Sequence, residues 1–259
     1  MIYINNNNNK MKIKRFTDTH ALKPDNYSQD KTKILMLNCS LKSEETSNTE
    51  SLLKEVEELY YENYSDVVVE IVRVAEYDIE PGISHEKLSE RDQFDLIYKK
   101  MKQTDILIIG TALWFGERTS ITQRILERMI GSYGDYNQYN QYSLYGKVGA
   151  VVVTGNEDGA HSASGETLYN LSRLGCLIPP NPNSYWVGDA GPGPSYIESN
   201  GTENFYTNKS MLYLVHNTHY FSNLIKENPY KRDLKMLDKE AEDRVKTKKK
   251  YRRSSVSGE

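Results

Sequence analysis

Residues 38–49 carry the hydroxyl and amide side chains that a phosphate-binding loop needs. They follow a short apolar run. A segment that joins a buried strand to a helix presents free backbone N–H groups and the positive end of the helix dipole to an anion. The hydroxyls of Ser40, Ser47 and Thr49 and the Asn48 amide could complete a cage for one phosphate. The alternative is ordinary N-capping, which a single Ser or Thr satisfies. The segment lacks the glycine spacing of a Walker loop or a dinucleotide fingerprint, which disfavours ATP and Rossmann-type NAD binding.

Two later segments carry groups suited to a flat ring. Trp114 and Phe115 follow the apolar run 106–109, and we interpret the pair as too bulky for a tight turn and as flat apolar surface for a ligand. The alternative is that both side chains cap the core. Residues 154–161 contain two glycines, which let the backbone approach a ligand closely, and amides that could pair with the edge of a heterocycle. The alternative there is a plain turn. A flat heteroaromatic ring with one phosphate would use all three segments, and FMN fits that description.

Apolar periodicity predicts the elements that position these segments. Short apolar or β-branched runs predict strands over 34–37, 67–74, 105–110, 148–153 and 185–187. Residues spaced by three and four predict helices around 52–60, 94–101, 121–129, 168–174 and 212–225, with Gly175 just past the fourth. Strands and helices alternate, and continuous apolar strands are typical of a parallel sheet covered on both faces. We therefore expect an α/β fold whose ligand lies at the carboxyl ends of the strands.

Composition divides the chain into three parts. Residues 1–31 include five consecutive asparagines and no sustained apolar period, so we expect them to be disordered. Residues 32–228 fit one domain. Residues 229–259 form a charged, partly helical tail, and seven of the ten residues 244–253 are basic. The tail is either a solvated extension or a contact for an acidic partner or a membrane surface.

The remaining features exclude several classes of protein. The net charge is −3, which gives no reason to expect nucleic-acid binding, and no apolar run is long enough for a membrane span. Two cysteines in 259 residues cannot form a disulfide framework, and the N-terminus has no apolar signal region. We expect a soluble, cytoplasmic protein. His216 and His219 are three residues apart but lack the carboxylate partners of a zinc motif, so no metal site is predicted.

The core resembles the flavodoxin-like NAD(P)H-dependent FMN reductase and quinone reductase family. The resemblance rests on the serine-started loop 40–49, which ends Ser-Asn-Thr, on the run 111–116 (Thr-Ala-Leu-Trp-Phe-Gly) and on Thr-Gly-Asn at 154–156. It covers most of residues 32–228. It implies a doubly wound, five-stranded parallel sheet in the order 2-1-3-4-5 with helices on both faces. It also implies noncovalent FMN, NAD(P)H as co-substrate and a homodimer that completes each flavin site.

The same resemblance implies which residues hold FMN. In the family, the first loop holds the phosphate, the second segment lies along the isoalloxazine ring and the ribityl chain, and the third meets the pyrimidine side of the ring. The residues that take these roles here are Ser40, Lys42, Ser47, Asn48 and Thr49; then Thr111, Ala112, Leu113, Trp114, Phe115 and Gly116; and then Thr154, Gly155 and Asn156, with their neighbours Glu157, Gly159 and His161. His161 could stabilise the reduced ring, and no other catalytic residue is assigned.

The leading hypothesis is an NAD(P)H-dependent flavoprotein oxidoreductase with a small electron acceptor, such as free flavin or a quinone. No second nucleotide-binding pattern is present, so NAD(P)H would stack on the flavin and leave before the acceptor enters, which predicts ping-pong kinetics. One alternative is a flavodoxin-type electron-transfer protein, although the mildly acidic core weighs against it. Another is a non-enzymatic module of the same fold that has lost FMN, because Glu44 and Glu45 would repel a phosphate unless both point to solvent.

Residues 131–147 form a further segment with an unusual composition. Tyrosine recurs there at every third position, from Tyr133 to Tyr145, among Asn, Gln, Gly, Asp and Ser. We predict a long loop before the fourth strand. The loop could cover the flavin or meet a second subunit, since tyrosine suits wet interfaces, or it could be a surface insertion.

Overall fold

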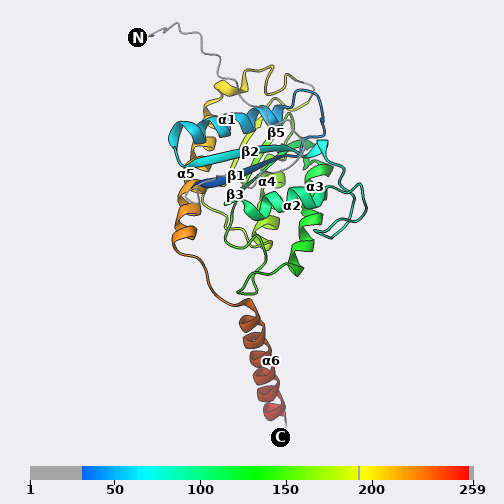
Figure 1. Ribbon diagram of the computed structural model, residues 1–259, viewed down its shortest axis with the longest axis vertical. Coiled ribbons are helices and arrows are strands. Elements are labelled where there is room, and N and C mark those ends of the chain that lie inside the picture. The colour runs from blue at the N-terminus through cyan, green and yellow to red at the C-terminus, as the bar shows by residue number, and fades with distance from the viewer. Residues whose placement is uncertain (1–30, 192, 257–259) are drawn as a thin grey trace.

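A twisted parallel sheet forms the centre of the molecule (Figure 1). The computed structural model describes residues 31–191 and 193–256, and the prediction of disorder for 1–31 therefore lies almost entirely outside the described residues. The parallel strands are β1 (Thr32–Asn38), β2 (Val67–Arg73), β3 (Ile106–Trp114), β5 (Val148–Gly155) and β6 (Asn183–Val187). They lie in the order β2-β1-β3-β5-β6, which confirms the predicted order 2-1-3-4-5.

Helices cover both faces of the sheet, as predicted. On one face lie α1 (Asn48–Asn63) and α5 (Phe205–Glu227), whose apolar sides pack on the strands with Met36, Ile108 and Val152. On the other face lie α2 (Phe94–Gln103), α3 (Ser120–Met129) and α4 (Ala160–Arg173). Short 3-10 helices span Val74–Glu76, Ile130–Gly134 and Gly201–Glu203. Because β1, β3 and β5 are buried on both sides, their sequences are almost continuously apolar.

Polar residues at the helix ends explain where the helices begin and stop. Ser47, Thr119 and Asn204 cap the N-termini of α1, α3 and α5, each accepting a hydrogen bond from the backbone N–H three residues later. Gly175 follows α4 with a φ of 101°, and the Cys176 N–H donates to the Leu171 carbonyl at 3.0 Å. This is the glycine C-terminal motif predicted from the sequence.

The third strand differs from the prediction. It does not stop at Gly110 but continues to Trp114, because it pairs with β5 through Ala112 and then with the short strand β4 (Glu117–Arg118). Phe115 (φ 55°) and Gly116 (φ 77°) form the two-residue turn between β3 and β4. Positive φ at both positions is typical of a hairpin turn that matches the twist of the strands. The interpretation of the Trp-Phe pair as too bulky for a tight turn was therefore wrong, since Phe115 stands in the turn with its side chain 94% exposed.

A buried ion pair holds the long segment between β2 and α2. Arg128 and Asp92 are both fully buried, with 2.7 Å between Arg128 Nη2 and Asp92 Oδ2. The Arg128 guanidinium also donates to the carbonyl oxygens of Glu80, Ser84 and Glu86. Burial acts to raise the pKa of Asp92, but hydrogen bonds from Arg128 and from backbone N–H groups lower that pKa overall. One side chain thus fixes residues 80–86, which belong to no helix or strand.

The last helix, α6 (Leu234–Val256), projects away from the body (Figure 1). Its first residue is tied to the tyrosine-rich loop, since the Leu234 N–H donates to the Tyr139 carbonyl at 3.2 Å. That loop leads into β5, so it lies at the amino ends of the strands, at the opposite edge from the predicted ligand site. Within one copy of the chain, the loop therefore lies away from the predicted ligand site. None of the helices within the described ranges is long and apolar enough to cross a membrane.

Candidate functional site

The first loop gathers hydroxyl groups at the carboxyl end of β1. Ser40 and Ser47 are both buried, and the Ser47 hydroxyl donates to the Ser40 hydroxyl at 2.9 Å. The Asn38 side chain accepts from the Ser40 N–H at 3.1 Å, which folds the chain back after the strand. Ser47 also caps α1, so the N–H groups of Asn48 and Thr49 begin the helix without an intrahelical carbonyl partner. Hydroxyls and a helix N-terminus therefore meet at one place.

Arg73, at the end of β2, holds this loop in shape. Its Nη1 atom donates to the carbonyl oxygens of Ser43 and Glu45, both at 2.9 Å, and its Nη2 atom pairs with the carboxylate of Glu50. This role of Arg73 was not predicted from the sequence. The only sequence signal was a basic residue at the end of the predicted second strand, because the three residues that Arg73 contacts lie 23 to 30 positions away along the chain.

The acidic residues of the loop are placed so that they do not oppose an anion. Glu44 and Glu45 are exposed, and Glu45 pairs with Lys42, which is also exposed, at 3.2 Å. Glu50 is half-buried, which acts to raise its pKa, but hydrogen bonds from Arg73 and Lys54 lower that pKa overall. Its charge is thus compensated. The condition set from the sequence, that Glu44 and Glu45 point to solvent, is met.

Two of the residues assigned to the phosphate loop have protein partners instead. The hydroxyls of Thr49 and Thr154 lie 2.8 Å apart in the interior and join α1 to the end of β5. The Asn48 side chain accepts from the Ile197 N–H at 3.1 Å, so it anchors the long connection after β6. Both contacts bring the first and third segments, and that connection, to the same edge of the sheet.

The second segment presents its aromatic side chains to solvent at this edge. Trp114 is 54% exposed, whereas Leu113 is buried in the core on the α2–α4 side. Thr111 is buried too, and its hydroxyl accepts from Thr122 Oγ1 at 2.8 Å and from the Thr119 N–H at 3.2 Å. Of the six residues assigned here, only Trp114, Phe115 and, in part, Ala112 and Gly116 offer surface to a ligand.

The third segment packs tightly against the second. The Gly116 N–H donates to the Glu157 carboxylate at 3.0 Å. A Cβ atom on Gly159, whose φ is 117°, would come within 2.2 Å of the Gly116 carbonyl oxygen, and one on Gly155 within 2.6 Å of the Leu113 side chain. The Asn156 side chain donates to the Pro194 carbonyl at 2.9 Å. The glycines here serve the contact between two chain segments.

His161 belongs to a row of aromatic groups beside β6. Its Nε2 atom lies 2.9 Å from the Tyr185 hydroxyl, which donates to the Tyr206 hydroxyl at 3.3 Å. The hydrogen bond with Tyr206, together with burial, raises the pKa of Tyr185 to about 12. Tyr185 therefore stays protonated near neutral pH. The row was not predicted, because Tyr206 lies in the first turn of α5, 45 residues beyond His161 in the sequence.

The donor set at this edge fits FMN. The hydroxyls of Ser40 and Ser47, the N-terminus of α1 and the exposed Lys42 are donors of the kind that bind a phosphate dianion. Trp114 and Phe115 offer flat apolar surface on the neighbouring strand end. The three segments follow β1, β3 and β5, which are neighbours in the sheet.

Comparison with known proteins agrees with this arrangement. A family model described as NADPH-dependent FMN reductase matches residues 32–190. A curated 8-demethyl-8-aminoriboflavin-5'-phosphate synthase from Streptomyces davaonensis is 36% identical over 211 residues, which cover 78% of this chain and 81% of that protein. A divalent metal cation transporter, MntH, from Mycobacterium bovis is 31% identical over 216 residues, but this chain spans only 31% of its length.

A solved structure gives the same picture. The crystal structure of RosB with the bound intermediate 8-demethyl-8-formylriboflavin-5'-phosphate has a TM-score of 0.73 and 34% sequence identity to this chain. The match covers 82% of this chain and 87% of that one. Both the sequence match and the structural match thus extend well beyond the three segments at the edge of the sheet.

Proposed function

Because the chain belongs to the NADPH-dependent FMN reductase family, we propose that it is an NAD(P)H-dependent flavoprotein oxidoreductase that reduces a small acceptor such as free flavin or a quinone. The observation that carries the proposal is the meeting of a hydroxyl-lined helix N-terminus with exposed aromatic side chains at one edge of the sheet. When bound, FMN supplies the redox chemistry: it accepts a hydride from NAD(P)H and passes two electrons on.

The chain's own residues bind and orient the reactants in this proposal. Ser40, Ser47 and the first N–H groups of α1 bind the phosphate, and Arg73 keeps their loop in shape. Trp114 and Phe115 lie along the ring. A second copy of the chain completes the site, which is supported by the very high exposure of Phe115. The exposure of Glu44 and Glu45 removes the reason for the alternative that FMN has been lost.

A second candidate function is chemical change of FMN itself. The synthase from Streptomyces davaonensis is named for a riboflavin phosphate that carries an amino group in place of the 8-methyl group, and its match spans most of both chains. The RosB structure holds a riboflavin phosphate with a formyl group at the same position. In this candidate the phosphate loop has the same role, but FMN is the substrate instead of a resident cofactor.

To test the two candidates, the purified protein is incubated with excess FMN, free FMN is removed by gel filtration, and the absorbance spectrum of the protein is recorded. NADPH is then added without oxygen. In parallel, the flavin is extracted after aerobic incubation, with and without an amino-group donor such as an amino acid, and its mass is measured.

Retained flavin that NADPH bleaches, with an unchanged flavin mass, would support the reductase. A flavin whose mass matches replacement or oxidation of the 8-methyl group would support the second candidate. A protein that retains no flavin and leaves the flavin mass unchanged would contradict both. With the reductase established, parallel initial-rate plots for NADPH and acceptor are expected, and intersecting plots would contradict the ping-pong scheme.

A further inference from the structure

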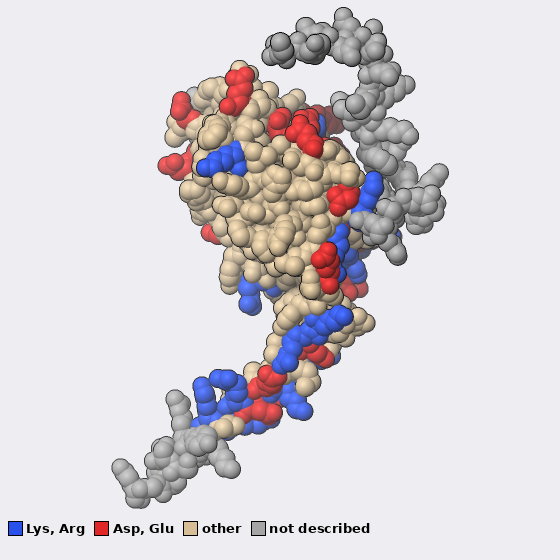
Figure 2. Space-filling model, turned by 90° about the vertical axis from the view of Figure 1, so that its left-hand side faces the viewer, with Lys and Arg blue, Asp and Glu red and all other residues tan. Residues whose placement is uncertain are grey.

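The projecting helix α6 has its charges divided between its two halves. The first half carries four acidic residues, and the second half is basic (Figure 2). The acidic residues are Asp238, Glu240, Glu242 and Asp243, and they outnumber the two lysines of that half, Lys235 and Lys239. The described basic residues of the second half are Arg244, Lys246, Lys248 and Lys249, with no acidic residue among them. Every described side chain from 235 to 249 is exposed. The helix is therefore a dipolar rod with no cover from its own body.

The body holds this helix in a defined direction. The Gln141 side chain donates to the carbonyl oxygens of Tyr230 and Arg232, at 2.8 and 3.0 Å, and the Asn140 side chain donates to Asp233 at 2.9 Å. The ring of Tyr145 stacks on that of Tyr230, with centroids 6.0 Å apart. Residues 131–147, the tyrosine-rich loop, thus serve as a mount for α6.

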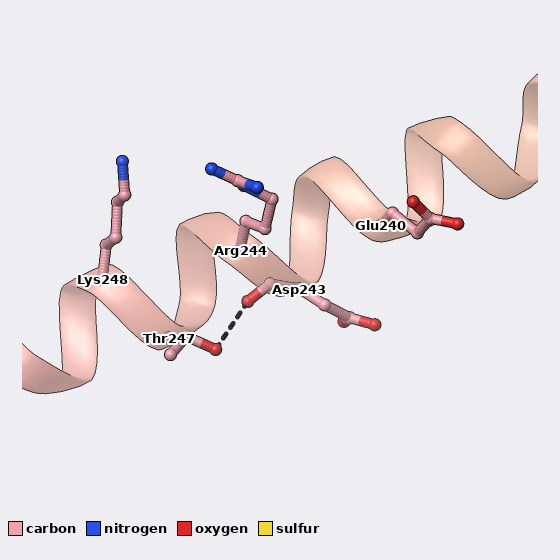
Figure 3. A pocket seen from close by; sticks show the side chains of 5 residues that line it. All are labelled: Glu240, Asp243, Arg244, Thr247 and Lys248. Atoms are coloured by element: carbon pink, nitrogen blue, oxygen red, sulfur yellow. Dashed lines mark hydrogen bonds between the residues drawn. The ribbon is translucent and has the colours of Figure 1, made fainter.

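The helix has little to stabilise it alone. Leu234, Leu237, Ala241 and Val245 form a narrow apolar stripe, and Leu237 and Val245 lie in solvent. Lys246 pairs with Glu242 and Asp243, at 3.8 and 3.4 Å. Figure 3 shows the open surface around Arg244 and Lys248, which is lined by residues of this one helix. Within the described chain, Asp238, Arg244, Lys248 and Lys249 have no ion-pair partner within 4 Å. A helix with so few internal pairs calls for a partner.

We propose that α6 is an assembly arm that pairs antiparallel with α6 of a second copy of this chain. Antiparallel pairing places the acidic half of each helix on the basic half of the other, and it brings Ala241 of one copy beside Val245 of the other. An anionic surface would meet only the basic half and would be repelled by the acidic half. Residues 234–243 are net acidic and residues 244–249 are basic, so in an antiparallel pair each half meets a half of opposite net charge in the second copy.

Helix geometry gives this pairing a register that can be measured. At about 100° per residue, Asp238 and Lys249 lie on the same side of the apolar stripe. In an antiparallel pair centred between Asp243 and Arg244, Asp238 of one copy therefore lies opposite Lys249 of the other. The two Asp238 residues are then about 16 Å apart along the axis. The proposal concerns the edge of the sheet opposite the flavin site, and it does not depend on the proposed function.

The test uses single cysteines in the full-length protein. Cys39 and Cys176 are 0% and 5% exposed, so the wild-type chain is the control without an accessible thiol. The variants Asp238→Cys and Lys249→Cys are oxidised separately and as an equal mixture, and cross-linked dimers are separated on a denaturing gel. The pair's symmetry leaves one Asp238–Lys249 contact intact in the mixed dimer. We expect about tenfold more cross-link in the mixture than in either variant alone, and a strong loss near 1 M salt through screening.

Three results would overturn the proposal. Equal cross-linking in all three samples would indicate random collision, and dominant self-cross-linking of Asp238→Cys would indicate a parallel pair. Absence of the mixed cross-link together with binding of the wild-type protein to vesicles of anionic phospholipid would assign the helix to a membrane surface. Because the substituted positions 238 and 249 lie outside the core, both variants should match the wild type in flavin retention and circular dichroism. These two measurements serve as controls for folding.

Discussion

Arg73 shows how one side chain can organise a binding loop from a distance. It holds two loop carbonyls and neutralises Glu50 at the start of α1, where an uncompensated carboxylate would oppose a phosphate. The hydroxyls of Ser40 and Ser47 supply the hydrogen-bond donors. The loop between them belongs to no helix or strand, so its shape depends on contacts such as those of Arg73. The affinity for FMN should therefore depend on a residue that does not touch it.

We expect Arg73→Gln to raise the dissociation constant of FMN by about tenfold, or about 1.4 kcal/mol. The variant loses the carbonyl contacts and leaves the Glu50 charge uncompensated beside the phosphate. The measurement is quenching of flavin fluorescence during titration of the protein. Arg91→Gln, at an exposed arginine, is the control and should bind like the wild type.

The double variant Arg73→Gln/Glu50→Gln separates charge from shape. Removing the carboxylate should recover part of the lost affinity, because the repulsion disappears while the loop stays loose. Affinity that stays at the wild-type level in Arg73→Gln would contradict the role assigned to Arg73.

At the scale of elements, the junction between the β3–β4 hairpin and α4 depends on close backbone contact. Gly159 precedes α4 with a positive φ and lies against the Gly116 carbonyl. A side chain at position 159 would strain the backbone, because φ is positive, and would also collide with the Gly116 carbonyl oxygen of the turn. The hairpin that presents Trp114 and Phe115 is thus positioned by a residue that has no side chain.

We expect Gly159→Ala to lower the free energy of unfolding by more than about 1 kcal/mol, since a left-handed alanine alone costs about that much. Gly165→Ala, in the middle of α4 with open space around it, should raise it by about 0.5–1 kcal/mol. Urea unfolding of the two variants gives both values. A free energy of unfolding that does not fall in Gly159→Ala would contradict the role assigned to Gly159.

The sequence predicted most elements because their patterns are local. The strand order and the helices on both faces follow from buried apolar runs and from spacings of three and four, as for Phe94, Ile97 and Met101. The end of β3 was missed because a two-residue turn with a positive φ at Phe115 has no common sequence signal. That turn depends on the pairing with β4 and on the contact with Gly159, which only the folded chain supplies.

The candidate site could be located from the sequence, but not the partners within it. The carboxyl edge of a parallel sheet follows from topology, so the three segments were expected to meet. The pairing of Thr49 with Thr154 and the contact of Asn48 with Ile197 join residues 105 and 149 positions apart. No spacing rule relates positions so far apart in the sequence. The assignment of the Asn48 and Thr49 side chains to the phosphate stays a prediction.

At the scale of the whole molecule, the two ends of the sheet have different tasks. The carboxyl edge carries the proposed flavin site, and the amino edge carries the mount for α6. The tyrosine-rich loop, for which the sequence left a flavin cover, a subunit contact or a surface insertion open, contacts residues 230–233. Its composition suits this role, because tyrosine and glutamine offer both ring surface and hydrogen-bond donors.

We expect Gln141→Ala to loosen the mount without unfolding the core. Its two hydrogen bonds to the Tyr230 and Arg232 carbonyls would be lost, so the Leu234 amide should exchange with solvent about thirtyfold faster, at about 1 kcal/mol per bond. Hydrogen-exchange mass spectrometry of the peptide around residues 229–236 measures this. Gln138→Ala, an exposed neighbour in the same loop, is the control. Unchanged exchange in Gln141→Ala would contradict the role of the mount.

The direction of α6 also decides whether its charges can guide a substrate toward the proposed flavin site. The helix has 23 residues, so it is about 34 Å long, and its basic half points away from the body (Figure 1). At physiological ionic strength the field of a charge fades over about 8 Å. The lysines of α6 therefore cannot steer anionic NAD(P)H toward the flavin edge. The rate of substrate capture and its response to salt are set by the charges beside the site, among them Lys42 and Arg73, and the arm is free to vary in charge without altering turnover.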